Sequence, residues 1–99
     1  MKITLNKTDF ELSEDFETLN KLIEAGYDPL QILFDAYDKD RKLKTKESID
    51  ILSIAAGLSY EEGGKAMFGG GIMKISEFAN QYVVKLATGD DDDAVKKNT

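Results

Sequence analysis

The chain has 99 residues, a formal charge of −6, and neither cysteine nor histidine. Its length suits one domain with a modest core, and the missing residue types remove thiolate chemistry, the usual zinc ligands and the commonest general base. We therefore expect a non-enzymatic protein without a metal or cofactor. The negative charge repels nucleic-acid phosphates, and no apolar run reaches the roughly 20 residues that span a bilayer. We expect a cytoplasmic protein that binds neither nucleic acid nor membrane.

The chain opens with a predicted β-hairpin. Apolar and polar residues alternate over residues 2–6 and again over residues 9–12, the pattern of half-buried strands, and the polar pair Lys7-Thr8 links the two segments. A lone hairpin is marginal in water, so we expect its apolar face to lie on helices.

Two short helices are predicted next. Ser13 and the acidic residues after it suit a helix start, and Gly26 suits its end. Asp28 followed by Pro29 marks a second start, and that helix should run to about Tyr37. Apolar residues spaced three to four apart should face the core. In the first helix these are Phe16, Leu19, Leu22 and Ile23, and in the second Leu30, Leu33, Phe34 and Tyr37.

A densely charged stretch, residues 38–46, predicts a solvated connector that leads into the most apolar helix of the chain. This core helix has few polar positions and must be enclosed by other elements. Thr45 can cap its first turn, and Gly57 supplies a left-handed stop. The connector begins like an EF-hand calcium loop, but Lys42 stands where a ligand oxygen is needed and Ile49 where the closing Glu belongs, so we expect no calcium site.

Two more helices follow the core helix. Ser59 and Glu62 match a reciprocal capping box, but glycines at 63 and 64 weaken the helix that it opens, and the triple glycine at 69–71 ends that helix. The triple glycine predicts a plain loop or a hinge. The last helix should end at Gly89 and has one clear apolar stripe. The stripe consists of Ile75, Phe78, Ala79, Tyr82, Val83 and Leu86.

Together these elements predict a mainly α fold, a compact bundle of about five short helices with a small N-terminal β-hairpin. We expect residues 1–89 to form a single globular domain. Residues 90–99 contain four consecutive aspartates followed by small and polar residues, which cannot bury enough apolar surface to order themselves. A disordered acidic and polar tail is predicted there.

This order of elements in a small acidic protein resembles the tail assembly chaperones of long-tailed bacteriophages and prophages. The resembling parts are residues 3–26, with the sequence FELSEDFETLNKL, and the segment AAGLSYEE, where the core helix ends and a capped helix begins. The triple glycine has no counterpart in the family. The resemblance implies a protein of the bacterial cytoplasm that binds the tape measure protein or another tail protein, keeps its apolar helical surface soluble during tail assembly, and forms homo-oligomers.

Members of that family are commonly made in two forms, the longer one through a minus-one ribosomal frameshift near the end of the short form. Lys96, Lys97 and Asn98 can be encoded by a slippery heptamer, and they are also ordinary composition for a lysine-rich chain. The codons decide between these two interpretations.

A chaperone of this kind needs an exposed and adaptable apolar surface. Methionine adapts to varied partner shapes, and apolar residues on both sides of the triple glycine form the best candidate cluster, with core packing as the alternative for each. The candidate partner-binding residues are Met67, Phe68, Ile72, Met73, Phe78 and Tyr82.

A second class of function is also open: a small acidic inhibitor or regulator that mimics DNA and binds a basic protein. Its support is the net charge and the many carboxylates, and its weakness is the basic residues that interrupt them between 39 and 46. A mimic should bind its target with strong salt dependence, whereas a chaperone should bind an apolar helix with little.

Overall fold

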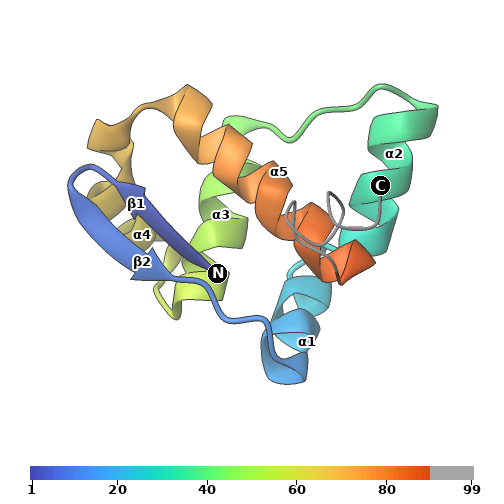
Figure 1. Ribbon diagram of the computed structural model, residues 1–99, viewed down its shortest axis with the longest axis horizontal. Coiled ribbons are helices and arrows are strands. Elements are labelled where there is room, and N and C mark those ends of the chain that lie inside the picture. Colours follow the sequence, from blue (N-terminus) through green and yellow to red (C-terminus); the bar gives the residue numbers. More distant parts are fainter. Residues whose placement is uncertain (90–99) are drawn as a thin grey trace, which may run out of the picture.

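A computed structural model describes residues 1–89, which form a two-stranded β-hairpin, five α-helices and one short 3₁₀ helix (Figure 1). The predicted mainly α fold with five short helices and an N-terminal hairpin is confirmed. The tail predicted over residues 90–99 lies outside the described residues. In chain order the elements are β1 Lys2–Leu5, β2 Thr8–Glu11, α1 Phe16–Glu24, α2 Pro29–Asp38, α3 Thr45–Ala56, α4 Tyr60–Met67, η1 Phe68–Gly70 and α5 Ile72–Thr88.

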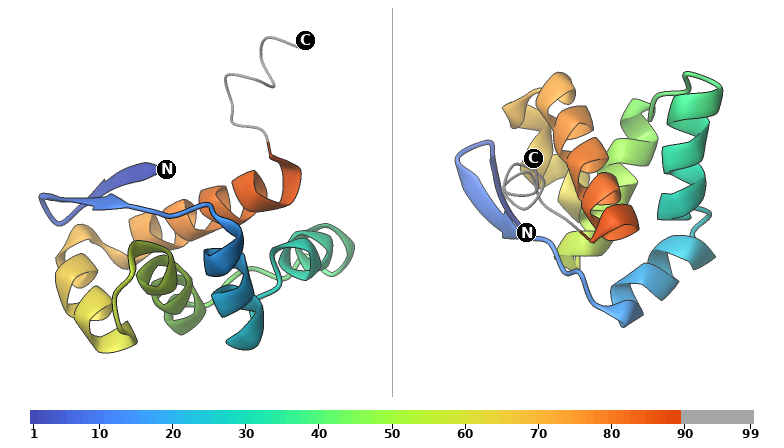
Figure 2. Two further views of the ribbon diagram at one scale, coloured as in Figure 1. Left: turned by 90° about the horizontal axis from the view of Figure 1, so that it is seen from below. Right: turned by 45° about the vertical axis from the view of Figure 1, so that its right-hand side comes forward.

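Helix α3 is the centre of the fold. It packs against α4 and α5 and also contacts α1 and β2. Ile51 and Leu52 have no exposed surface, as expected for a helix that is apolar on most of its circumference. Helix α5 contacts α2 as well as α3, and the view from below shows it running between the hairpin and α3 (Figure 2). Within residues 1–89, no helix combines the length and apolarity needed to cross a bilayer.

The hairpin is closed by a two-residue turn. Ile3 pairs with Phe10 and Leu5 with Thr8, which places the turn at Asn6 and Lys7, one residue earlier than predicted. Both turn residues have positive φ, 51° and 61°, as a type I′ turn requires. The right-handed twist of paired strands favours that turn, and the alternation of side chains then sends the apolar residues of both strands to the helices.

Two helix starts differ from the sequence prediction. Asp15, not Ser13, caps α1, because its carboxylate accepts the Thr18 N–H at 2.8 Å. The N-cap of α3 is Lys44, not Thr45, and its N–H donates to the Glu47 carboxylate at 2.9 Å. The sequence alone did not decide which of these neighbouring polar residues is the N-cap.

The other predicted caps are confirmed. Asp28 accepts the Leu30 N–H at 3.0 Å at the start of α2, and Ser59 and Glu62 bond reciprocally at 3.1 Å at the start of α4. Gly57 and Gly89 end α3 and α5 in the left-handed conformation.

The inner face predicted for α2 is wrong at three of its four residues, and only Leu33 is partly buried. Leu30 and Phe34 are 50% exposed and Tyr37 is 80% exposed, whereas Pro29 is buried and Ile32 packs against the core. The apolar residues of α2 form two stripes, and docking on α5 buries only one of them. Helix α1 shows a smaller deviation of the same kind, because Leu22 is buried while Phe16 and Ile23 are exposed.

Candidate functional site

The six residues predicted to bind a partner divide into a buried and an exposed set. Met67 and Tyr82 have no exposed surface and belong to the core, which is the alternative of core packing stated for each candidate. Phe78 is partly buried and packs against the core. Phe68, Ile72 and Met73 are exposed by 63%, 46% and 78%. We call these three the corner residues, because they lie where the chain turns from α4 through η1 into α5 (Figure 1).

Glycines bring this corner against the turn of the hairpin. A Cβ atom on Gly69 would lie 2.5 Å from the Asn6 side-chain oxygen, and one on Gly70 would lie 2.8 Å from the Asn6 backbone nitrogen. The Asn6 amide also donates to the Ala66 carbonyl at 3.2 Å. Where the sequence predicted a plain loop or a hinge, the chain therefore forms a 3₁₀ turn packed on the hairpin, and this contact positions the corner residues.

An open groove lies beside Phe68, between α3 and α4, with a volume of about 500 Å³. Tyr60 and Phe68 line it on either side of Gly64, each about one helical turn away, and Gly64 between them adds no side chain. Lys46 lies over Tyr60, with the ammonium nitrogen 5.0 Å from the centre of the Tyr60 ring. The lining residues are Ile49, Tyr60, Glu61, Gly64, Lys65 and Phe68.

The groove was missed from the sequence because Tyr60 and Gly64 were assigned only a helix start and a weak point. The spacing of Tyr60, Gly64 and Phe68 at i, i+4 and i+8 was the available signal, since such residues share one helix face. On the rim, Lys65 pairs with Glu61 at 3.1 Å across one turn of α4. The groove therefore has an apolar interior and a charged, exposed edge.

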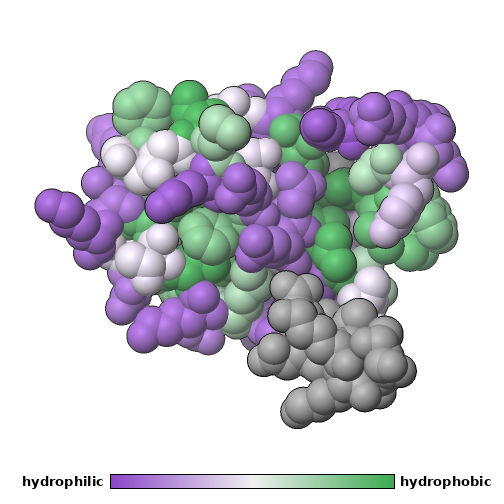
Figure 3. Space-filling model, turned by 45° about the horizontal axis from the view of Figure 1, so that its top comes forward, coloured by the Kyte–Doolittle hydropathy of each residue, from purple (hydrophilic) through white to green (hydrophobic). Residues whose placement is uncertain are grey.

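Hydrophobic surface is visible in several places in the space-filling view (Figure 3). One lies at the upper left, over the corner between α4 and α5, and another at the right, over α2. In α2, the residues Leu30, Phe34 and Tyr37, which the sequence placed inside, are at least half exposed. Large apolar side chains exposed together mark interaction surfaces in folded proteins.

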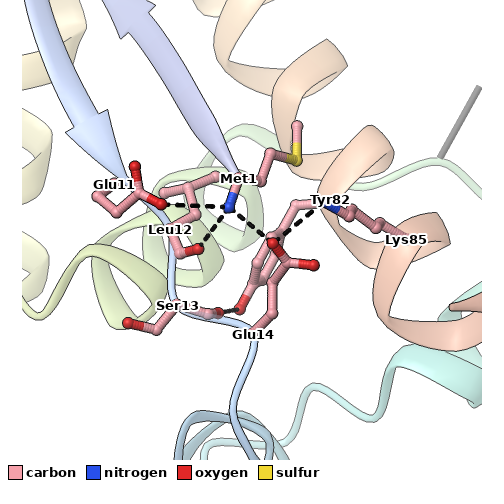
Figure 4. A network of polar contacts seen from close by, with 7 residues as sticks. All are labelled: Met1, Glu11, Leu12, Ser13, Glu14, Tyr82 and Lys85. Atoms are coloured by element: carbon pink, nitrogen blue, oxygen red, sulfur yellow. Dashed lines mark hydrogen bonds and ion pairs between the residues drawn. The ribbon is translucent and has the colours of Figure 1, made fainter. Parts of the chain in front are cut away.

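Tyr82 is buried in the core, and its hydroxyl belongs to a polar network that ties the end of the hairpin to α5 (Figure 4). Its hydroxyl donates to the Ser13 carbonyl. The Ser13 N–H in turn donates to the Ala55 carbonyl of α3 at 2.8 Å. Burial, together with the charges of Glu14 and Asp15, raises the pKa of Tyr82 well above its usual range. The hydroxyl therefore stays protonated and serves as a structural donor.

Glu14 is the charged centre of the same network (Figure 4). Its carboxylate accepts from the Met1 amino group at 2.7 Å and from Lys85 at 3.1 Å, and the Met1 amino group also donates to the Leu12 carbonyl at 2.9 Å. These hydrogen bonds hold the pKa of Glu14 below its ordinary value, and the bond from the Met1 amino group has the largest effect. The network joins the chain start, the link to α1 and α5.

The charged connector is folded back on α2 and α3 by ion pairs. Arg41 contacts Glu47 at 3.0 Å and Asp35 at 3.9 Å, and Lys39 also lies 3.9 Å from Asp35. A small cavity of about 120 Å³ remains between the connector and α2. No group of three acidic side chains among residues 1–89 is placed to hold a metal ion. Here cations alternate with the carboxylates, which therefore form no continuous acidic surface.

No protein-family model, curated protein or solved structure matches this chain significantly.

Proposed function

We propose that this protein is a non-enzymatic phage tail assembly chaperone that binds apolar helical segments of the tape measure protein in the bacterial cytoplasm and self-associates during tail assembly. The observation that carries the proposal is the set of exposed corner residues Phe68, Ile72 and Met73 beside the groove between α3 and α4. The resemblance to tail assembly chaperones in residues 3–26 supports it independently.

The groove suits the apolar face of a helix. Helices that bind in grooves do so through large side chains spaced three or four residues apart, and a groove of about 500 Å³ accommodates such an anchor between Tyr60 and Phe68. Met73, the most exposed corner residue, has a flexible side chain that adapts to different partner residues. A protein that covers many successive segments of one long helical partner needs adaptable contacts of this kind.

The expected affinity of one site is modest. Burying a large apolar side chain contributes about 1.5–3 kcal/mol, and association itself costs several kcal/mol. A single corner therefore binds a single segment weakly. Many weakly bound copies along one tape measure protein would provide the coating. Weak binding of each copy also suits a protein that must leave again when the tail tube forms.

Co-expression with the tape measure protein of the same phage or prophage tests the proposal. The chain should keep the tape measure protein in the supernatant after lysis, and the double variant Phe68→Glu/Met73→Glu should lose this ability. Both side chains are exposed, so the fold should remain within about 0.5 kcal/mol of the original stability. Thermal unfolding of the purified variant checks this.

Phe16→Glu/Ile23→Glu is the matched control, because it places the same two negative charges on exposed apolar residues of α1, away from the corner. It should keep the tape measure protein soluble. If the corner variant is as effective as the original chain, or if the original chain has no effect, the proposed function is wrong.

A further inference from the structure

Helix α2 carries an apolar stripe that the described fold does not cover. Leu30, Phe34 and Tyr37 follow one another at i, i+4 and i+7, so they lie on one face, and each is at least half exposed. The opposite side of the helix, which includes Pro29 and Ile32, packs on the core. No charged residue interrupts the stripe, and this spacing is that of a seam between two helices.

We propose that α2 pairs with α2 of a second copy of this chain, antiparallel, about a two-fold axis that passes beside Phe34. In that arrangement Phe34 contacts the partner's Phe34, and Leu30 contacts the partner's Tyr37. The stripe is nearly symmetric about Phe34, which is what a two-fold interface requires of a single surface. The inference names the self-association surface of the chaperone proposed above, and it is tested on the isolated protein, so either proposal can fail alone.

Charges beside the stripe select the antiparallel arrangement. At 100° per residue, Gln31 and Asp38 lie along the same edge of the stripe, near its two ends. Antiparallel pairing brings Gln31 next to the partner's Asp38, and the Gln31 amide, which already donates to Asp35 at 2.9 Å, keeps a second N–H for that carboxylate. Parallel pairing would leave the two Asp38 carboxylates on opposite edges of the interface, away from either Gln31 amide, and would align the helix dipoles unfavourably.

The exposed area of the stripe fits a weak dimer. At roughly 200 Å² for a large side chain, the three residues offer roughly 350 Å² in each copy, or roughly 700 Å² in the pair. Flanking polar side chains bring the interface towards the lower limit of about 1,000–1,200 Å² for specific complexes. We therefore expect a reversible dimer whose population depends on protein concentration.

Cysteine cross-linking tests the arrangement directly, because the chain contains no cysteine of its own. Phe34→Cys should form a disulfide-linked dimer in a glutathione redox buffer. An equimolar mixture of Leu30→Cys and Tyr37→Cys should give mainly the mixed dimer, which mass spectrometry identifies. Met73→Cys, at a position even more exposed than Phe34 but located at the corner, is the control and should cross-link about tenfold less.

The outcomes separate the alternatives. Dimers of Leu30→Cys with itself and of Tyr37→Cys with itself, in place of the mixed dimer, would overturn the antiparallel arrangement. The arrangement would also be overturned if Phe34→Cys cross-linked no more strongly than Met73→Cys.

Sedimentation provides a second readout that needs no cysteine. The original chain should shift from monomer to dimer with increasing concentration, and Phe34→Glu should stay monomeric while its circular dichroism spectrum is unchanged. A chain that remains monomeric up to about 100 μM, where a dimer of 10 μM Kd would dominate, contradicts the proposal. A Phe34→Glu variant that still dimerises also contradicts the proposal, because the contact must then lie elsewhere.

Discussion

Gly63 lies so close to Ser53 that a Cβ atom on residue 63 would stand 1.8 Å from the Ser53 side-chain oxygen and 2.7 Å from its Cβ. This is where α4 packs against α3. From the sequence, Gly63 only weakens a helix, at a cost of about 1 kcal/mol relative to alanine. The packing explains why that cost is tolerated, because the two helices approach each other through the missing side chain.

Gly63→Ala should therefore destabilise the protein by about 1–3 kcal/mol, although alanine is the better helix former. Gly64→Ala is the matched control, because a Cβ there would meet only Ile49 at an ordinary 3.6 Å. It should stabilise the protein by about 0.5–1 kcal/mol. Urea unfolding of both variants measures the difference, and equal shifts in one direction would contradict the close contact.

Replacement of Ser53 by alanine should raise the free energy of unfolding by about 1 kcal/mol. The hydroxyl is fully buried and has no hydrogen-bond partner among the described residues, so its removal ends a desolvation cost. Ser48→Ala serves for comparison, since the Ser48 hydroxyl is equally buried but donates to the Lys44 carbonyl at 3.0 Å. That variant should lose about 1 kcal/mol. Differential scanning calorimetry would expose an error if Ser53→Ala proved the less stable of the two.

Stability should fall in acid partly through Glu14. Hydrogen bonds from Met1 and Lys85 lower its folded pKa below the ordinary value of 4.5, so its contribution is present above pH 4.5 and is lost as the pH falls through the lowered pKa. Glu14→Gln should cost about 1 kcal/mol at pH 7 and flatten the loss of stability below pH 4.5.

Glu17→Gln is the control for this effect, because Glu17 is exposed and, within residues 1–89, pairs only with Lys21 at 3.8 Å. Its unfolding midpoint should follow that of the original chain from pH 7 to pH 3, since exposed pairs contribute little. A Glu14→Gln profile that runs parallel to the original would refute the role given to the network.

The hairpin turn should respond in opposite ways to two glycine changes. Lys7 holds a φ of 61°, which glycine adopts without strain, so Lys7→Gly should stabilise the protein by about 0.5–1 kcal/mol. Gly70→Ala should destabilise it by about 1 kcal/mol or more, because its Cβ would press on the Asn6 backbone. If Gly70→Ala is neutral by thermal unfolding, η1 does not pack on the hairpin as described.

The sequence predicted those features that depend on local chemistry. The capping box of Ser59 and Glu62, the stop at Gly57 and the buried stripe of α5 were all anticipated, because spacing and backbone preference decide them within one element. The enclosure of α3 followed from its composition alone.

Features that depend on contacts between elements were not predictable in this way. Met67 was a candidate surface residue because it adjoins the glycines, yet the direction of α4 turns it into the core. The apolar residues of α2 allow two faces, and only the position of α5 selects one. The groove beside Phe68 likewise exists because α3 and α4 lie at a distance set by Gly63 and Ser53.

The most direct test of the proposed function is the affinity of the purified chain for an amphipathic helical peptide from the tape measure protein, measured by calorimetry at low and high salt. An apolar groove predicts binding that changes less than about threefold between 50 and 500 mM salt. It also predicts about tenfold weaker binding by Phe68→Glu, equal to about 1.4 kcal/mol. Absence of peptide binding, together with tight and steeply salt-dependent binding to a basic protein, would contradict the chaperone and favour an acidic inhibitor.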